Sequence, residues 1–243
     1  MPLRLQPGAP TRPASGRGGR RRRVSLFAAL RPSAAALDHL ALALSGAHAQ
    51  EARRPDGAPL VRWTPPELWH VTVSFFGDVP DGALPDLAAA LVPVARENPP
   101  PSLRLRGAGV FDRRVLWVGV GGVDADALRD LSAAVAEAAG EAGVRVDRRP
   151  RQRAHLTVAR AAAGARQARR RARSAGRRPG GGVADLTAGD PLAGPAAALS
   201  VYAGPDWTAH ELLLLESTPG DASGRRVYRT VETFPLAGAA ARG

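Results

Sequence analysis

The sequence contains no cysteine and no lysine, and it is poor in aromatic residues. The absence of cysteine excludes disulfide bonds and thiolate ligands for metals. No apolar run approaches the roughly 20 residues that a membrane-spanning helix needs. All 34 basic residues are arginines, and the abundance of Ala, Arg, Gly and Pro indicates a coding bias that raises arginine content throughout. We therefore expect no membrane association, and part of the basic charge needs no functional explanation.

Motifs that hold metals or nucleotide cofactors are also missing from the sequence. There is no HExxH segment and no cluster of Asp, Glu and His at metal-ligand spacing. The glycines of residues 119–122 follow a predicted strand, but the third spaced glycine of a nucleotide loop is absent, so we interpret them as a turn. We expect neither a metal nor a cofactor.

The net charge of +12 is concentrated in two blocks. Residues 1–23 carry +7 and residues 145–178 carry +12, which leaves −7 for the rest of the chain. The second block surrounds one of the two motifs described next, where a polyanionic substrate would approach. The coding bias toward arginine is the competing explanation for both blocks.

Two strand-like segments, residues 69–76 and 154–160, share the pattern His, apolar, Thr, apolar. Successive side chains of a strand point to opposite faces, so each segment presents one imidazole and one hydroxyl on its polar face. The four polar residues are His70, Thr72, His155 and Thr157. Two such strands facing each other would place two histidines and two threonines around one small anion.

This set of side chains suits the hydrolysis of a phosphodiester. One histidine can accept a proton from water and the other can donate a proton to the leaving oxygen, because imidazole titrates near neutral pH. Threonine hydroxyls can donate hydrogen bonds to the non-bridging oxygens, where charge gathers in the transition state. One copy of the pattern is more often an ordinary half-buried strand, but two copies among five histidines favour a catalytic pair. The other histidines, His39, His48 and His210, lack the pattern.

With these motifs in place, the chain resembles the two-histidine (2H) phosphoesterases, and within them the LigT-like RNA 2′,3′-cyclic phosphodiesterases, also called 2′-5′ RNA ligases. The resemblance covers roughly residues 24 to 238. The segments that carry it are 24–30, 62–79, 109–111, 114–120, 215–217 and 228–236. It implies hydrolysis of the 2′,3′-cyclic phosphate at an RNA 3′ end to a 2′-phosphate, without a metal.

The resemblance also implies roles for individual residues. It makes His70 the proton donor and His155 the acceptor, with Thr72 and Thr157 binding phosphate, although the residues themselves do not distinguish acid from base. Arg160 matches an arginine that follows the second family motif and is a candidate substrate contact. Ala154 stands where the family usually has proline, which bears on local geometry. Phe76 and Phe111 are candidates for stacking on a base, with core packing as the alternative.

We predict an α+β fold with two lobes, in which antiparallel sheets face each other across a central cleft and helices lie outside. Residues 1–23 form a disordered basic tail, residues 24–238 form the phosphoesterase domain, and residues 239–243 form a second tail. The lobes divide at about residue 100, with strands that can exchange between them. The predicted helices are 33–46, 82–95, 124–143 and 164–175. The predicted strands are 24–30, 69–76, 102–106, 114–120, 144–148, 154–160, 198–203, 211–217 and 227–234.

The beginning of the chain allows more than one interpretation. Translation from Val24, where the first predicted strand begins, is an alternative to a start at Met1. Residues 20–50 also imitate a twin-arginine export signal, but charged residues interrupt the apolar stretch, and cleavage there would delete the first strand. We expect a cytoplasmic monomer.

The sequence thus predicts an enzyme that acts on RNA with a 2′,3′-cyclic phosphate end. Three alternatives stay open. The same chemistry could act on a small cyclic nucleotide or an ADP-ribose cyclic phosphate. The His and Thr faces could hold a phosphate without turnover in an RNA-binding module. The enzyme could also join RNA ends through a 2′-5′ linkage.

Overall fold

The computed structural model describes residues 23–53, 59–146, 153–165, 190–220 and 226–237. Residues 1–22 and 239–243 of the predicted tails and residues 166–175 of the last predicted helix lie outside these ranges, whereas Arg23, predicted as part of the first tail, is the first residue of a strand. The strands are β1 (Arg23–Leu30), β2 (Val61–Trp63), β3 (Val71–Pro80), β4 (Ser102–Phe111), β5 (Val115–Gly121), β6 (His155–Ala161), β7 (Ala203–Thr208), β8 (Glu211–Pro219) and β9 (Arg226–Pro235). The helices are α1 (Ala34–Ala52), α2 (Leu84–Glu97), α3 (Ala125–Glu141) and α5 (Ala193–Ala198), with the short 3₁₀ helices η1 (Pro66–Leu68) and η2 (Asp81–Ala83).

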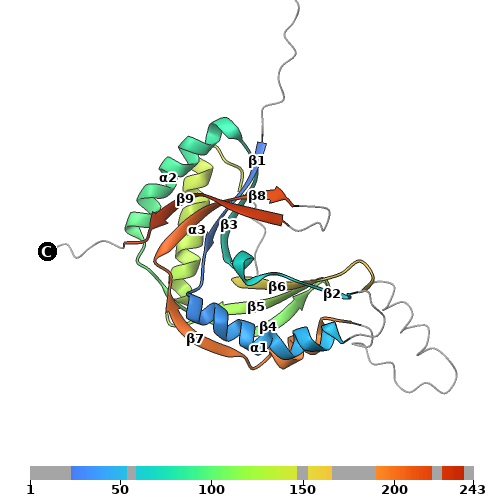
Figure 1. Ribbon diagram of the computed structural model, residues 1–243. Helices are drawn as coiled ribbons and strands as arrows, with labels where there is room; N and C mark the ends of the chain where they lie inside the picture. Colours follow the sequence, from blue (N-terminus) through green and yellow to red (C-terminus); the bar gives the residue numbers. More distant parts are fainter. Residues whose placement is uncertain (1–22, 54–58, 147–152, 166–189, 221–225, 238–243) are drawn as a thin grey trace, which may run out of the picture.

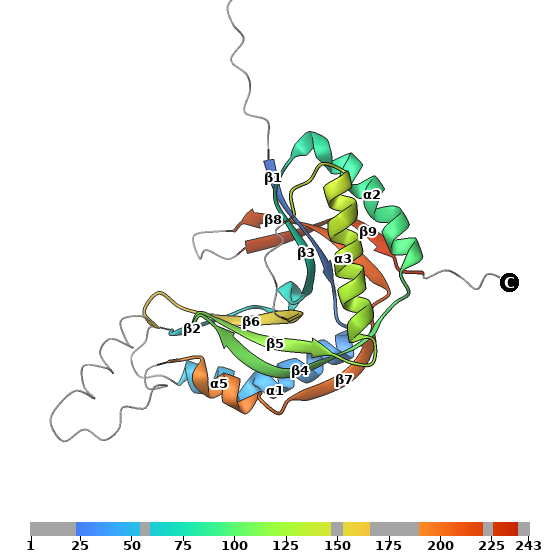
Figure 2. The ribbon, with the colours of Figure 1, turned by 180° about the vertical axis from the view of Figure 1, so that it is seen from behind.

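The strands form one antiparallel sheet that curls strongly (Figures 1 and 2). Its order is β7-β4-β5-β6-β3-β1-β8-β9, and β2 pairs with β6 beside this path. The two halves of the sheet meet where β3 pairs with β6, and the Cα partners at this junction are Val71 and Leu156. Helices α2 and α3 pack on the half that contains β3 and β9, whereas α1 and α5 pack on the half that contains β7 and β4. The predicted α+β class is confirmed.

Apolar side chains at helical spacing explain why the helices pack as they do. Helix α3 buries Leu128, Leu131 and Val135 on one face, as its sequence pattern predicts. Full burial of each such side chain stabilises the fold by about 1.5–3 kcal/mol. Within the described residues, no helix is both long and apolar enough to span a membrane.

Several predicted boundaries are corrected by tertiary contacts. Helix α1 does not end at Gly46 but continues to Ala52. The Glu51 Oε1 atom accepts hydrogen bonds from the amides of Leu60 and Val61, at 2.6 and 3.0 Å, and this ties the end of the helix to β2. Strand β2 has only three residues and had no sequence signal.

Two predicted strands are also wrong where the structure describes them. Residues 198–203 contain the end of α5 and a turn, in which the Ser200 hydroxyl donates to the Ala197 carbonyl at 2.7 Å, and β7 begins only at Ala203. Residues 144–146 are not a strand, and residues 147–148 lie outside the described ranges.

The strands of each half come from distant parts of the chain. Strand β8, from the C-terminal part, pairs with β1 and is followed by β9 at the edge, while β6 lies between β5 and β3. The division into two lobes at about residue 100 stays a prediction. The consequence for the site is that the two motif strands, β3 and β6, are neighbours at the centre of the sheet.

Candidate active site

The two His-x-Thr-x motifs face each other across the junction of the two sheet halves. Val71 and Leu156 are paired antiparallel, and such a pair has a local two-fold axis. The motif histidines and threonines flank this pair in sequence, so His70 lies beside Thr157 and Thr72 lies beside His155. The sequence motifs are therefore brought together as a symmetric set of four polar side chains.

Both histidines are held by the same kind of hydrogen bond. His70 Nδ1 lies 2.8 Å from the Leu68 carbonyl oxygen, and His155 Nδ1 lies 3.0 Å from the Arg153 carbonyl oxygen. A carbonyl can only accept, so each Nδ1 donates its proton. This bond sets the orientation of each ring, and Nε2 is then the nitrogen that gains or loses a proton.

The four motif residues line one cleft of about 640 Å³. The charged and polar residues of its wall are Ser25, Thr64, His70, Thr72, Arg129, Ser132, Arg153, His155, Thr157, Arg160, Ser217, Arg226 and Tyr228. None of the described residues of this wall is acidic. The cleft therefore favours an anionic ligand.

His70 is packed between two aromatic rings on its side of the cleft. Its ring centroid lies 4.9 Å from Phe27 and 5.1 Å from Tyr228, whose ring is perpendicular to the imidazole. Burial lowers the pKa of His70 below its usual value of 6.5, and the nearby Arg31 and His155 act in the same direction. The hydrogen bond to the Leu68 carbonyl opposes this shift in pKa.

His155 has a corresponding aromatic support on the other side. The Phe111 ring meets the imidazole edge to face at 5.0 Å and stacks on Trp117 at 5.1 Å, with an angle of 26° between the two planes. Gly109 lies opposite Trp117 in the β4–β5 ladder, and an added Cβ would overlap the indole ring. Phe111, a predicted base-stacking residue, thus contacts a motif histidine and is not among the residues that line the cleft.

A β-bulge in each motif strand decides which later residue faces the cleft. In β3, Thr72 pairs with Ala29 and Ser74 pairs with Ala28, so Val73 is an extra residue. In β6, Thr157 pairs with Trp117 and Ala159 pairs with Leu116, which makes Val158 the extra residue. Each bulge shifts the alternation of side chains by one position after the threonine.

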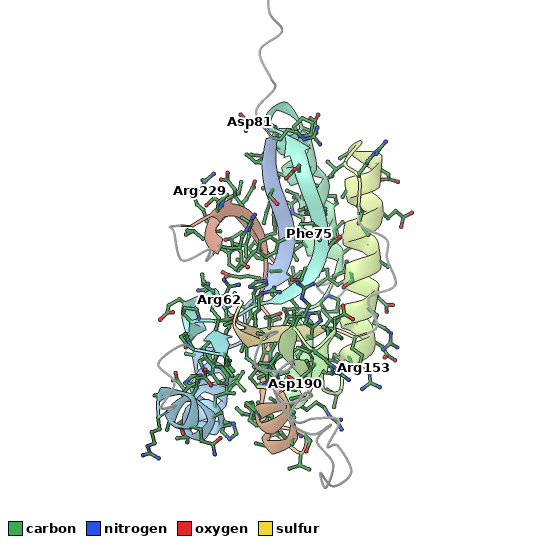
Figure 3. The ribbon with its side chains drawn as sticks, turned by 90° about the vertical axis from the view of Figure 1, so that its right-hand side faces the viewer. Arg62, Phe75, Asp81, Arg153, Asp190 and Arg229 are labelled. Carbon is green, nitrogen blue, oxygen red and sulfur yellow. The ribbon has the colours of Figure 1, made fainter. Side chains whose placement is uncertain are left out.

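The shifted alternation places Phe75 and Arg160 at equivalent positions, five residues after His70 and His155. Both line the cleft. Phe75, which is labelled in Figure 3, is 37% exposed. Phe76, the other predicted stacking residue, is only 4% exposed and belongs to the hydrophobic core, so Phe75 replaces it as the aromatic residue of β3 in the cleft. Arg160 lies where a contact to a bound anion is possible.

Four arginines from three parts of the chain line the cleft. Arg153 and Arg160 belong to the basic block of residues 145–178, most of which lies outside the described ranges. Arg129 comes from α3 and forms an ion pair with Asp126. Arg226 comes from β9.

Sequence reasoning missed the residues that β8, β9 and α3 add to the cleft. Arg129 and Ser132 lie on a helix that was identified only by its apolar face, and Ser217, Arg226 and Tyr228 reach the cleft through strand pairing far from the motifs. No local pattern marks them. Within the described part of the chain, no group of three His, Cys, Asp or Glu side chains could hold a metal ion.

The chain is similar to known proteins in sequence and in fold. The family model described as the 2′-5′ RNA ligase superfamily matches residues 32–181. An RNA 2′,3′-cyclic phosphodiesterase of Geobacillus stearothermophilus is 39% identical over 106 residues, which are 42% of this chain and 33% of that protein. A protein of the same name from Aquifex aeolicus is 30% identical over 87 residues, 34% of this chain and 46% of that protein. These matches span less than half of each relative's length.

Solved structures share the fold over most of the chain. The apo form of Escherichia coli LigT superposes with a TM-score of 0.57 at 19% identity, covering 88% of this chain and 98% of LigT. The protein TT0787 of Thermus thermophilus gives a TM-score of 0.55 at 24% identity, covering 88% of this chain and 99% of TT0787. The predicted LigT-like fold is confirmed.

Proposed function

Because the chain belongs to the 2′-5′ RNA ligase superfamily, we propose that it hydrolyses RNA 2′,3′-cyclic phosphate ends to 2′-phosphomonoesters. The observation that carries this proposal is that His70, Thr72, His155 and Thr157 line one cleft around a local two-fold axis. The relatives named RNA 2′,3′-cyclic phosphodiesterase support the same reaction.

The reaction needs one proton transfer on each side of the phosphorus. One imidazole accepts a proton from water through Nε2 as the water oxygen attacks phosphorus. The bond from phosphorus to the 3′ oxygen breaks, and the other imidazole donates its Nε2 proton to that oxygen. The product carries the phosphate on the 2′ oxygen. Each histidine ends in the protonation state in which its partner began, so proton exchange with solvent restores the enzyme.

The environment of His70 is compatible with the donor role that the family resemblance implies. Burial that lowers the pKa of His70 also makes its imidazolium a stronger acid. An anionic phosphate in the cleft would favour the charged form and offset the burial. His155 is then the acceptor that activates water. The two assignments exchange if the proton donor proves to be His155.

The remaining cleft residues would bind the substrate. The hydroxyls of Thr72 and Thr157 would donate hydrogen bonds to the non-bridging oxygens, and the Arg160 guanidinium would add a charged contact to the phosphate. Phe75 offers an exposed ring on which the terminal base can stack, a contact worth about 1–3 kcal/mol. We also propose that the reaction proceeds without a metal and that the active form is a cytoplasmic monomer.

A second candidate function is the joining of RNA ends through a 2′-5′ linkage, which the name of the matching family favours. Ligation uses the same proton transfers as hydrolysis, with a 5′ hydroxyl of RNA in place of water as the attacking group and the 3′ oxygen again as the leaving group. Incubation of RNA 2′,3′-cyclic phosphate ends with RNA 5′ hydroxyl ends distinguishes ligation from hydrolysis by product length. Turnover of a cyclic mononucleotide or an ADP-ribose cyclic phosphate in preference to RNA would indicate a small-molecule substrate.

Substitution of each motif histidine tests the mechanism. We expect His70→Asn and His155→Asn each to lower kcat by about 10² to 10⁴, the usual contribution of a positioned acid or base, with unchanged circular dichroism spectra. His210→Asn is a matched control, because His210 is exposed and lies outside the cleft. Near-wild-type turnover in either motif variant would end the two-histidine mechanism. RNA binding without turnover by the wild-type protein would favour the binding module.

A further inference from the structure

Arg226, the first residue of β9, carries a positive charge that no described residue neutralises. It lines the cleft, and its Nε atom donates to the Ser217 hydroxyl at 2.8 Å while Nη2 donates to the Ser217 carbonyl at 2.9 Å. Ser217 is only 7% exposed, so both acceptors are fixed in the sheet. The guanidinium is therefore oriented by two neutral oxygen atoms, and among the described residues no carboxylate offsets its charge.

Arg229 on the same strand shows the contrasting arrangement. Its Nε and Nη2 atoms both donate to Glu216 Oε2, at 3.0 and 2.6 Å, and Glu216 is only 5% exposed (Figure 3 labels Arg229). Consecutive residues of β8 thus hold two arginines of β9, one through a carboxylate and one through serine oxygens. Of these two arginines, Arg226 lines the cleft and is available to neutralise an anionic group of a ligand.

The backbone of Arg226 stands apart from the motif strands along the sheet. Strand β9 is three strands from β3, and neighbouring strands are about 4.8 Å apart. Tyr228, two residues after Arg226 and therefore on the same face of β9, reaches back to Phe27 and His70, with ring centroids 5.2 and 5.1 Å apart. Arg226 thus faces the same side of the sheet as His70 and lines the same cleft, from a strand three positions away from β3.

We propose that Arg226 binds the phosphodiester on the 5′ side of the terminal nucleotide, so that the enzyme prefers RNA of two or more nucleotides to a cyclic mononucleotide. This inference rests on the proposed hydrolysis of 2′,3′-cyclic phosphates. A guanidinium matches two oxygens of a phosphate in one plane, and one that is already oriented loses little freedom on binding. Arg226 is then a specificity-determining residue.

Three substrates with a 2′,3′-cyclic phosphate end show whether Arg226 recognises the charge of the internal phosphodiester. They are a mononucleotide, a dinucleotide, and the same dinucleotide with an uncharged methylphosphonate in place of the internal phosphodiester. For the wild-type protein, we expect kcat/KM to be at least about tenfold higher for the charged dinucleotide than for the mononucleotide or the methylphosphonate dinucleotide. A hydrogen bond to a charged group contributes a difference of this size. In Arg226→Gln, the ratio of charged to uncharged dinucleotide should fall toward one.

The controls separate this inference from the proposed function. Arg96→Gln removes one positive charge from an exposed position of α2 outside the cleft, and it should leave the ratio unchanged. Arg226→Lys keeps the charge without the planar fork, so its ratio of charged to uncharged dinucleotide should be intermediate. This variant also provides the test if Arg226→Gln does not fold. A wild-type ratio near one, or an unchanged ratio in both Arg226 variants, overturns the inference while hydrolysis stands. Absence of turnover on all three substrates instead refutes the proposed function.

Discussion

Gly109→Ala is expected to disturb the cleft through two aromatic rings without touching a motif residue. The added Cβ would overlap the Trp117 indole, lying 2.9 Å from Cε2 and 3.0 Å from Cη2. The indole has to move, and Phe111 stacks on it while meeting His155 edge to face at 5.0 Å. Overpacking of this kind costs about 1–3 kcal/mol of unfolding free energy. A displacement of about 1 Å at a catalytic group costs up to about 10²-fold in rate.

Urea unfolding and turnover of a 2′,3′-cyclic phosphate measure the two effects separately. We expect Gly109→Ala to lower the unfolding free energy by about 1–3 kcal/mol and to lower kcat by roughly 10- to 100-fold. Gly46→Ala is the matched control, because a Cβ at this helix position meets no atom within 4 Å. That substitution should stabilise the protein by about 0.5–1 kcal/mol without a change in kcat.

A double-mutant cycle decides whether the indole transmits the effect. Trp117→Leu removes the ring that the new Cβ would overlap. The double variant should therefore lose less unfolding free energy than the sum of the losses in the two single variants. We expect a coupling free energy of at least about 0.5 kcal/mol. Strict additivity, or a Gly109→Ala variant with wild-type stability and kcat, would refute the argument that Gly109 and the two rings position His155.

Three further predictions concern residues that line the cleft or lie beside it. Thr72→Ala should lower kcat by about 10²-fold, the effect of losing one donor to the transition state, with KM less affected; an unchanged kcat would remove Thr72 from the phosphate site. Phe75→Ala should raise KM about tenfold through lost stacking, whereas Phe76→Ala should leave KM unchanged but destabilise the core by about 3–5 kcal/mol in urea unfolding. Burial lowers the pKa of His70, and His70 must be protonated to act as the donor. The limb of the pH profile on which kcat/KM falls with rising pH should therefore lie below pH 6.5. Tyr228→Leu, which exposes the imidazole, should raise that pKa and move the limb upward, and a limb that stays in place would contradict this account of the pKa.

The part of the site that follows local rules could be predicted from the sequence. Alternation along a strand was enough to place His70 with Thr72 and His155 with Thr157 on polar faces. The sequence left Phe76 open between core packing and base stacking and left Arg160 undecided, because regular alternation does not show where a bulge shifts the faces of a strand. A bulge depends on the register with a neighbouring strand, which a single sequence does not reveal.

Longer-range pairing accounts for most of the rest. Tyr228 and Arg226 reach the cleft only because β8 pairs with β1 and β9 pairs with β8, and nothing in their own segment indicates a site. Similarly, the low helix propensity of Gly46 predicted that the first helix ends there. In the structure the helix continues to Ala52, and Glu51 accepts hydrogen bonds from the amides at β2. Tertiary contacts prevailed over a preference worth about 1 kcal/mol.

The most direct test of the central claim is the product formed from an RNA that ends in a 2′,3′-cyclic phosphate, in the presence of a strong chelator. The two-histidine account predicts chelator-resistant turnover that yields the 2′-phosphate, since the leaving oxygen is the 3′ oxygen. A 3′-phosphate product, or turnover that is abolished by the chelator and restored by a divalent metal, would contradict it.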